Sequence, residues 1–240
     1  MTVLVSMPYW NNAQWVEAAV RSVLAQTHRD LVCVVIGDGE EPPLKIADSR
    51  LVVYTLPENH GAYFAQSVAL GASPHPWYAP HAADDWSEPD HIERLMAYGT
   101  DTAAGAVWEH RGRSVRLVRK RYEVGLFRTE RLLALGGYNP AERLGQDSLM
   151  LRLLRVTGPL EASDHPTYHR IHRKGSLCNH RDTKKGSPAR EAMKVRNRAV
   201  AVKCERLRVN QVAAYRESII PAAIRAERDR HISALSELLS

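Results

Sequence analysis

The sequence predicts an α/β fold built on a largely parallel sheet. Residues 2–7 alternate β-branched and apolar side chains as a strand does, and residues 13–26 carry apolar side chains at helical spacing. Residues 31–36 then form a continuous apolar run, as expected of a strand covered on both faces. Strand, helix and buried strand in succession define a βαβ unit, which requires a parallel sheet.

The rest of the chain continues this pattern in order. Further strands are expected at 51–56, 77–80, 104–108 and 114–119, and an extended segment at 159–172. Further helices are expected at 60–72, 90–98, 129–135 and 144–156, and from residue 187 to the end with a break at Pro221. Gly136 and Gly137 are expected to end the helix at 129–135. The chain has no internal repeat.

Composition and charge divide the chain into two parts. Of its 240 residues, 44% are hydrophobic and 25% charged, as in ordinary globular proteins. Residues 181–240 hold 14 Lys and Arg against 7 Asp and Glu, whereas residues 1–180 are nearly neutral. We therefore expect a nearly neutral domain at 1–180 and a basic helical extension at 181–240. Such an extension could bind an anionic partner or form a homodimer contact, or its charges could lie on solvent-exposed helix faces.

Two features of the sequence bear on location. No apolar run reaches the roughly 18 to 20 residues that span a bilayer, and the first residues resemble a strand rather than a signal peptide. The cysteines Cys33, Cys178 and Cys204 are far apart and lack metal-ligand spacing. Both features predict a cytoplasmic protein with reduced thiols and no transmembrane segment.

Asp84 and Asp85 are adjacent carboxylates that follow the short strand at 77–80. Two such groups repel each other unless a cation or several donors compensate them. Oxygen ligands of this kind suit Mg²⁺ or Mn²⁺. The alternative is a helix start, with Asp85 or Ser87 as the N-cap.

Three chain segments are expected to meet at one edge of the sheet. Residues 8–12, 37–39 and 82–85 each follow a predicted parallel strand, and ligands of open α/β sheets bind where such strands end. The chain has no G-x-G-x-x-G or G-K-[ST] loop, which argues against an ordinary dinucleotide or P-loop site.

Several blocks of sequence, in their order and spacing, resemble the family 2 glycosyltransferases. Residues 5–13 (VSMPYWNNA) and 22–27 (SVLAQT) are similar to the first strand, turn and helix of that family. The resemblance continues in further blocks at 36–39 (IGDG), 58–61 (ENHG), 126–128 (LFR), 136–138 (GGY), 145–147 (GQD) and 168–172 (YHRIH) followed by Ser176.

This resemblance implies the GT-A fold, a Rossmann-like mixed sheet flanked by helices, here with a C-terminal helical extension. It implies an inverting, metal-dependent enzyme of the hexosyltransferase type that moves a sugar from a nucleoside diphosphate donor, with a UDP-sugar favoured. The acceptor would be a hydroxyl on a glycan, glycolipid, protein or modified DNA.

The resemblance also implies roles for individual residues. Asp147 stands where the family carries its general base, although it could instead be a first-turn acid or N-cap of the helix at 144–156. Asp84 and Asp85 would hold Mn²⁺ or Mg²⁺ against the departing diphosphate, and His172 would ligate the metal, touch phosphate or be structural. Asp38 is placed to accept a hydrogen bond from the base or ribose. The donor-binding residues implied are Pro8, Tyr9, Asn11, Asp38, Asn59, Gln66 and Asp84.

The chain departs from the family pattern at several positions. Ala82 and Gly37 replace acids, Gln66 stands where Arg is common, and Gln146 replaces a Glu. Because Asp38, Asp84 and Asp147 are kept, we expect an active enzyme. With Ala82 in place of an acid, we expect weak metal binding in the absence of nucleotide.

Other interpretations of the sequence are weaker. A zinc site made by His165, His169, His172 and His180 lacks a cysteine partner, and alternate residues of a strand point to opposite faces. Trp10, Trp15 and Trp86 could stack on a base or sugar, although Trp more often packs in the interior. Two other functions are a sugar nucleotidyltransferase, whose Gly-rich N-terminal loop is absent, and a non-catalytic protein whose basic tail binds nucleic acid.

Overall fold

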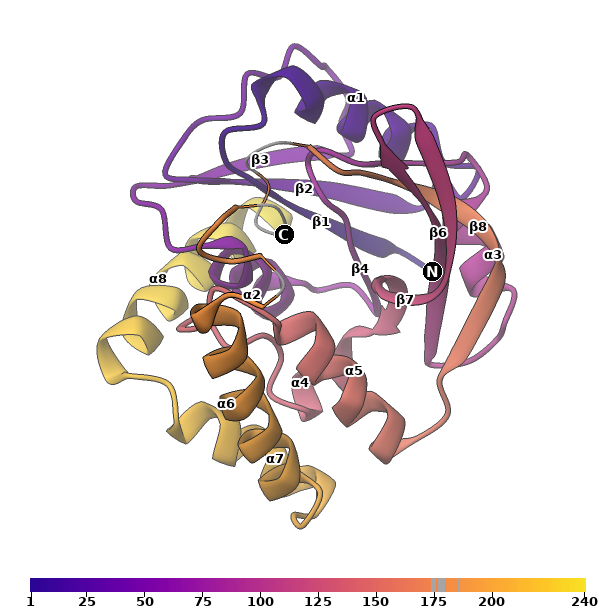
Figure 1. Ribbon diagram of the computed structural model, residues 1–240. Coiled ribbons are helices and arrows are strands. Elements are labelled where there is room, and N and C mark those ends of the chain that lie inside the picture. Colours follow the sequence, from indigo (N-terminus) through magenta and orange to yellow (C-terminus); the bar gives the residue numbers. More distant parts are fainter. Residues whose placement is uncertain (174–175, 177–179, 185) are drawn as a thin grey trace.

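A computed structural model describes residues 1–173, 176, 180–184 and 186–240, with the backbone alone described at 119–123. Its strands form one mixed sheet (Figure 1). The order across the sheet is β3 (Leu51–Leu56), β2 (Leu31–Asp38), β1 (Val3–Tyr9), β4 (Trp77–Pro80), β7 (Ser114–Arg128), β6 (Thr102–Arg111), β8 (Glu161–Ile171) and β5 (Trp86–Ser87). The first four strands are parallel, as predicted, and β7 joins β4 in the antiparallel direction.

Helices cover both faces of this sheet. Strand β1 shows why: Val3, Val5 and Met7 are buried on one face, and Leu4 is buried on the other. The first face packs against α1 (Ala13–Leu24) and α3 (His91–Met96). The second face packs against α2 (Ala62–Ala72), α4 (Thr129–Ala134) and α5 (Gln146–Thr157). Figure 1 shows the sheet between α1 and these lower helices. The mixed sheet flanked by helices confirms the predicted fold class.

Strands β6 and β7 form a long hairpin that turns at Gly112, where φ is +59°. The strand expected at 114–119 is longer than predicted and continues to Arg128 as β7. Strand β8, within the segment expected to be extended, pairs in parallel with β6 and in the antiparallel direction with β5. This arrangement carries the end of β8, residues 171–173, to the edge where the parallel strands end.

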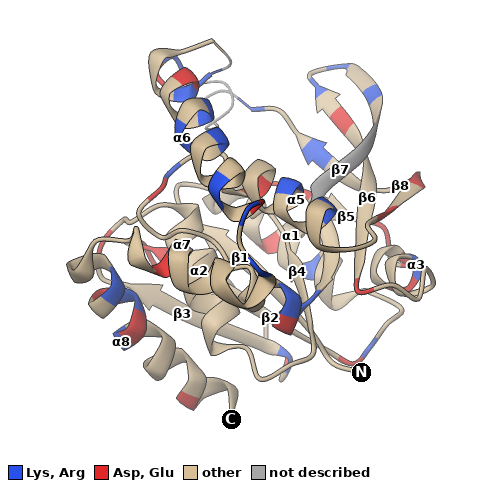
Figure 2. Cartoon of the chain, turned by 90° about the horizontal axis from the view of Figure 1, so that it is seen from below, with Lys and Arg blue, Asp and Glu red and all other residues tan. Residues whose placement is uncertain are grey.

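The C-terminal segment forms α6 (Pro188–Cys204), α7 (Val209–Ser218) and α8 (Ala222–Leu239). Pro221 precedes α8, as predicted, whereas the turn between α6 and α7 carries no proline or glycine signal. Ala201, Cys204, Val212 and Leu235 are buried in the same hydrophobic cluster as α2 and α5. The three helices therefore share a core with the sheet, and Figure 2 shows Lys and Arg along the exposed side of α6.

Two sequence-based expectations concern membranes and thiols. None of the helices in the described ranges has the length and apolarity needed to cross a membrane. Cys33 and Cys204 are free and buried, and Cys178 lies outside the described residues.

Candidate active site

The ends of β1, β2 and β4 lie side by side because these strands are parallel neighbours. Tyr9 at the end of β1 is in register with Gly37 in β2. The chain leaving β4 stays beside β1, where the N–H of His81 donates to the carbonyl of Ser6 at 2.8 Å. The three segments that the sequence placed at this edge are thus brought together.

Asp38 is a buried carboxylate, 2% exposed, that holds the start of α2. Its two oxygens accept the backbone N–H groups of His60 at 2.7 Å and Gly61 at 2.8 Å. Burial raises the pKa of Asp38, and these two hydrogen bonds oppose the rise. Gly61 has a φ of +99°, a conformation that glycine adopts readily, so the chain can turn sharply into α2. A ligand that donates a hydrogen bond to Asp38 would therefore share an oxygen that already accepts a backbone N–H.

Asp147 lies in the first turn of α5 and is fixed by α2. The hydroxyl of Tyr63 donates to its Oδ1 at 2.8 Å. Burial and the nearby Asp147 charge hold the pKa of Tyr63 well above its usual value, so Tyr63 stays a donor. Gly145, with φ of +70°, is the N-cap of the helix, so Asp147 is a first-turn residue and not the N-cap. Asp147 is a partly exposed first-turn acid, which is compatible with a role as base.

Arg143 makes a second link between the same two segments. Its guanidinium donates to the side-chain oxygen of Asn59 at 2.9 Å and to the Asn59 carbonyl at 2.8 Å. The Asn59 amide in turn donates to the carbonyl of Asp38 at 3.2 Å. Asp38, Asn59 and Asp147 are therefore joined around the first turn of α2, although the sequence separates them widely.

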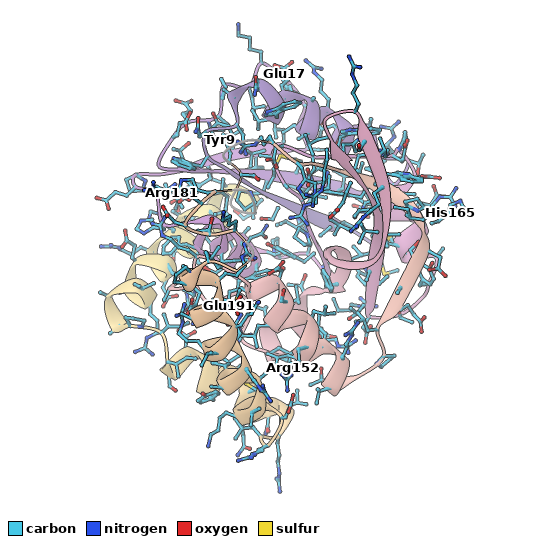
Figure 3. All side chains as sticks on the ribbon, viewed as in Figure 1. Tyr9, Glu17, Arg152, His165, Arg181 and Glu191 are labelled. Carbon is cyan, nitrogen blue, oxygen red and sulfur yellow. The ribbon has the colours of Figure 1, made fainter. Side chains whose placement is uncertain are left out.

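Glu40 organises the turn after β1. Its carboxylate accepts the Tyr9 hydroxyl and the backbone N–H of Asn11, each at 3.0 Å. Burial and Glu40 raise the pKa of Tyr9 to about 12. Asn11 has a φ of +51°, which non-glycine residues rarely adopt. Tyr9, labelled in Figure 3, is fully buried and Asn11 is exposed. Pro8 precedes Tyr9 within β1.

Asp84 and Asp85 lie in a turn, not at a helix start. Strand β5 follows them directly, and α3 begins only at His91, so neither Asp85 nor Ser87 is a helix N-cap. Asp85 is 7% exposed and accepts the backbone N–H of Ile171 at 2.8 Å. Burial and the neighbouring Asp84 raise the pKa of Asp85 to about 7.

Asp84 is paired with an arginine from the end of β8. The Nε of Arg173 donates to Oδ2 of Asp84 at 2.6 Å, and its Nη2 donates to the side-chain oxygen of Asn12. The two side chains of the ion pair are only 20% and 15% exposed. The end of β8, the turn after β4 and the turn after β1 are joined by this one guanidinium.

His172 points to a different acid. Its Nε2 is buried, has no hydrogen-bond partner among the described residues and lies 3.5 Å from Oε1 of Glu109, itself 1% exposed. Burial lowers the pKa of His172, as does the positive charge of Arg111. In the part of the chain that the structure describes, no three His, Cys, Asp or Glu side chains lie close enough to hold a metal ion. Because Arg173 is already paired with the Asp84 carboxylate, the residues as arranged do not fit a divalent ion there, and Mn²⁺ or Mg²⁺ binding stays a prediction.

The histidines considered as zinc ligands likewise form no group of three metal-binding side chains among the described residues. His169 instead contacts His110, Nδ1 to Nε2 at 2.9 Å, and its Nε2 contacts Glu88 at 2.9 Å. Trp86 stacks on the His169 ring, with centroids 3.5 Å apart, and is 37% exposed. Of the other tryptophans, Trp10 is 54% exposed and Trp15 is half-buried.

Gln66 lies apart from the residues above. It is 7% exposed on α2, and its side-chain oxygen accepts the hydroxyl of Tyr78 on β4. The layer between α2 and β4 thus holds its side chain, and a role in donor binding stays a prediction.

Four residues of this site were missed from the sequence: Tyr63, Arg143, Arg173 and Glu40. Each contacts a predicted site residue across a long stretch of chain. Arg143 and Arg173 stand close to the GQD and YHRIH blocks, so their position beside these blocks was the available signal. Glu40 directly follows the IGDG block and Tyr63 lies two residues after the ENHG block, so they carried the same signal.

The sheet order and flanking helices define the GT-A fold of glycosyltransferases, as comparison with solved structures confirms. The chain matches *S. aureus* TarS residues 1–349 in complex with UDP-GlcNAc with a TM-score of 0.67 and 16% identity, over 96% of this chain and 79% of that one. It matches the *Pyrobaculum calidifontis* mannosyltransferase PcManGT, in complex with GDP-Man and Mn²⁺, with a TM-score of 0.59 and 16% identity, over 98% of this chain and 74% of that one.

Sequence comparison identifies the family. Residues 4–152, more than half of the chain, match the family described as Glycosyl transferase family 2, and the chain belongs to this family. It is also 25% identical over 96 residues to an uncharacterized glycosyltransferase of *Haemophilus influenzae*. That match covers 37% of this chain and 30% of the relative.

Proposed function

We propose that the protein transfers a sugar from a nucleoside diphosphate donor to an acceptor hydroxyl, with inversion at the anomeric carbon. The observation that carries this proposal is the joining of Asp38 and Asp147 around the first turn of α2. That arrangement places a buried acid at the end of β2 and a partly exposed acid close by. Family membership supports the reaction class.

In this proposal the donor lies at the ends of β1, β2 and β4. The nucleoside meets Asp38 and Asn59, and the diphosphate extends toward Asp84. Pro8, Tyr9 and Asn11 line the β1 side of the donor. A UDP-sugar of a hexose is the favoured donor, since the similar TarS structures contain UDP-GlcNAc and UDP. PcManGT contains GDP-Man, so guanosine donors belong in the same test.

Asp147 acts as the general base. The acceptor oxygen attacks the anomeric carbon as the bond from that carbon to the diphosphate breaks, and Asp147 takes the hydroxyl proton. Tyr63 donates to one carboxylate oxygen, Oδ1, which orients the group. The second oxygen makes no such contact with Tyr63 and is the one we assign to the proton.

The acceptor classes predicted from the sequence are glycans, glycolipids, proteins and modified DNA. Family membership favours sugar transfer over nucleotidyl transfer or a purely nucleic-acid-binding role. The basic residues of the C-terminal segment would then serve an anionic acceptor or a homodimer contact.

A donor panel tests the proposal. The protein is incubated with UDP- and GDP-sugars, with Mn²⁺, with Mg²⁺ and with a chelator, and release of the nucleoside diphosphate is followed. We expect slow hydrolysis of at least one donor, because water can replace the acceptor. No release from any donor, together with no binding of nucleoside diphosphate, would contradict the proposed function.

A further inference from the structure

Arg173 occupies the position against Asp84 in which a metal ion was expected. Its Nε lies 2.6 Å from Oδ2 of Asp84, and its Nη2 bonds the side-chain oxygen of Asn12. The arginine and the aspartate are both mostly buried, with side chains 20% and 15% exposed. A second cation at Asp84 would therefore have to displace this guanidinium or lie next to it.

The same short segment also compensates Asp85. The backbone N–H of Ile171 donates to Oδ1 of Asp85 at 2.8 Å, two residues before Arg173. Two adjacent carboxylates are costly to bury without a cation or donors. The end of β8 supplies a cation, Arg173, for Asp84 and a hydrogen-bond donor, the Ile171 N–H, for Asp85. The two carboxylates are therefore compensated by the chain itself.

A guanidinium is chemically suited to a diphosphate. It is planar, keeps its charge at any working pH and carries five N–H groups arranged to donate to two phosphate oxygens at once. Charge that develops on a leaving diphosphate is stabilised by donors already fixed in place. Asp84 and Asn12 fix Arg173 from two sides, which provides that preorganisation.

We propose that Arg173, held by Asp84 and Asn12, is the cation that binds the diphosphate of the donor, so that donor binding does not require a divalent metal ion. This inference rests on the proposed function. In the transfer step the electron pair of the broken bond from the anomeric carbon goes to the diphosphate oxygen, and the acceptor proton goes to Asp147. Arg173 stays protonated throughout and compensates the diphosphate charge.

Calorimetric titration with UDP and with GDP, in chelator and then in Mn²⁺, tests this inference on the full chain. For the preferred nucleotide, wild type should bind in chelator within about threefold of its affinity in Mn²⁺. Arg173→Ala should weaken binding in chelator by about 10- to 100-fold, as expected for a lost hydrogen bond between charged groups. Arg173→Gln, which keeps donors but no charge, should also bind weakly.

Arg181→Ala is the matched control, because this arginine lies in the same stretch of chain with its side chain 87% exposed and pairs with Asp182 (Figure 3). Its affinity should equal that of wild type. Binding by wild type only in Mn²⁺ would overturn the inference and leave the proposed function standing. The inference would also be overturned if both Arg173 variants, shown by thermal melting to be folded, bound the nucleotide with the affinity of wild type. If neither UDP nor GDP binds in either condition, the proposed function is overturned as well.

Discussion

Replacing Asp147 by asparagine should stop sugar transfer while leaving the fold and the donor site intact. The asparagine keeps the size of the side chain and an oxygen that can accept the Tyr63 hydroxyl, now 2.8 Å from Oδ1. It removes the negative charge and most of the basicity. A general base contributes about 100- to 10,000-fold to a rate, so kcat should fall by at least 100-fold.

The cost in stability should be small. An acid in the first helical turn contributes about 0.3 to 1 kcal/mol through the helix dipole. A hydrogen bond to a charged acceptor exceeds a neutral one by about 1 kcal/mol, and the neutral bond to Tyr63 remains. The free energy of unfolding should therefore fall by about 1 to 2 kcal/mol.

Tyr63→Phe is the matched variant, because it removes the hydrogen bond to Oδ1 of Asp147 and keeps the carboxylate. Its stability should fall by a similar amount, about 1 to 2 kcal/mol. Its kcat should fall by less than about tenfold, since the base is present but less well oriented. If the two variants have similar stability but Asp147→Asn has a much lower kcat, the loss of activity comes from the missing base and not from a change in structure.

The assay measures nucleoside diphosphate release, the affinity for nucleoside diphosphate and urea unfolding for wild type and both variants. Donor affinity should change by less than about threefold in each case. If Asp147→Asn keeps the kcat of Tyr63→Phe, Asp147 is only a first-turn acid and the base is another group.

Three further predictions concern stability. Burial lowers the pKa of His91 from 6.5 to about 3. In the unfolded chain His91 therefore takes up a proton as pH falls below 6.5, whereas folded His91 stays neutral. This difference alone lowers the free energy of unfolding by about 2 kcal/mol between pH 8 and pH 5. The advantage of wild type over His91→Gln in urea unfolding should shrink by that amount, and a constant difference would refute the assignment. Gly145→Ala should cost about 1 to 2 kcal/mol, because φ is +70°, a conformation that is strained for a residue with a β-carbon; an unchanged midpoint of urea unfolding would contradict this. Leu235→Ala, at a fully buried position of α8, should cost about 2 to 5 kcal/mol, against less than about 0.5 for Leu238→Ala, 57% exposed on the same helix. Equal costs would show that α8 is not part of the core.

The parallel half of the fold could be predicted because its signals are local. Residues 31–36 are apolar throughout, and the strand β2 found there is buried on both faces. The same locality placed Asp38 and Asp84 at the strand ends. The length of β7 could not be predicted, because its residues 119–123 carry charge that conceals the continuous strand.

The contacts that complete the site could not be predicted, because each joins distant residues. Arg173 and Asp84 are separated by 89 positions, and their pairing depends on β8 lying between β6 and β5. Tyr63 and Asp147 are separated by 84 positions and meet only after α5 packs beside α2. The sequence also could not decide whether Asp84 lies in a turn or at the start of a helix, because acids are common in both. Only the pairing of β5 with β8 shows that it lies in a turn.

A crystal structure of the protein soaked with UDP or GDP would locate the donor site. We expect the nucleotide at the ends of β1, β2 and β4, with its nucleoside beside Asp38 and its diphosphate on the side of Asp84. A nucleotide bound elsewhere, such as the groove between α2, α4, α7 and α8 that Gly71 and Ile232 line, would contradict it.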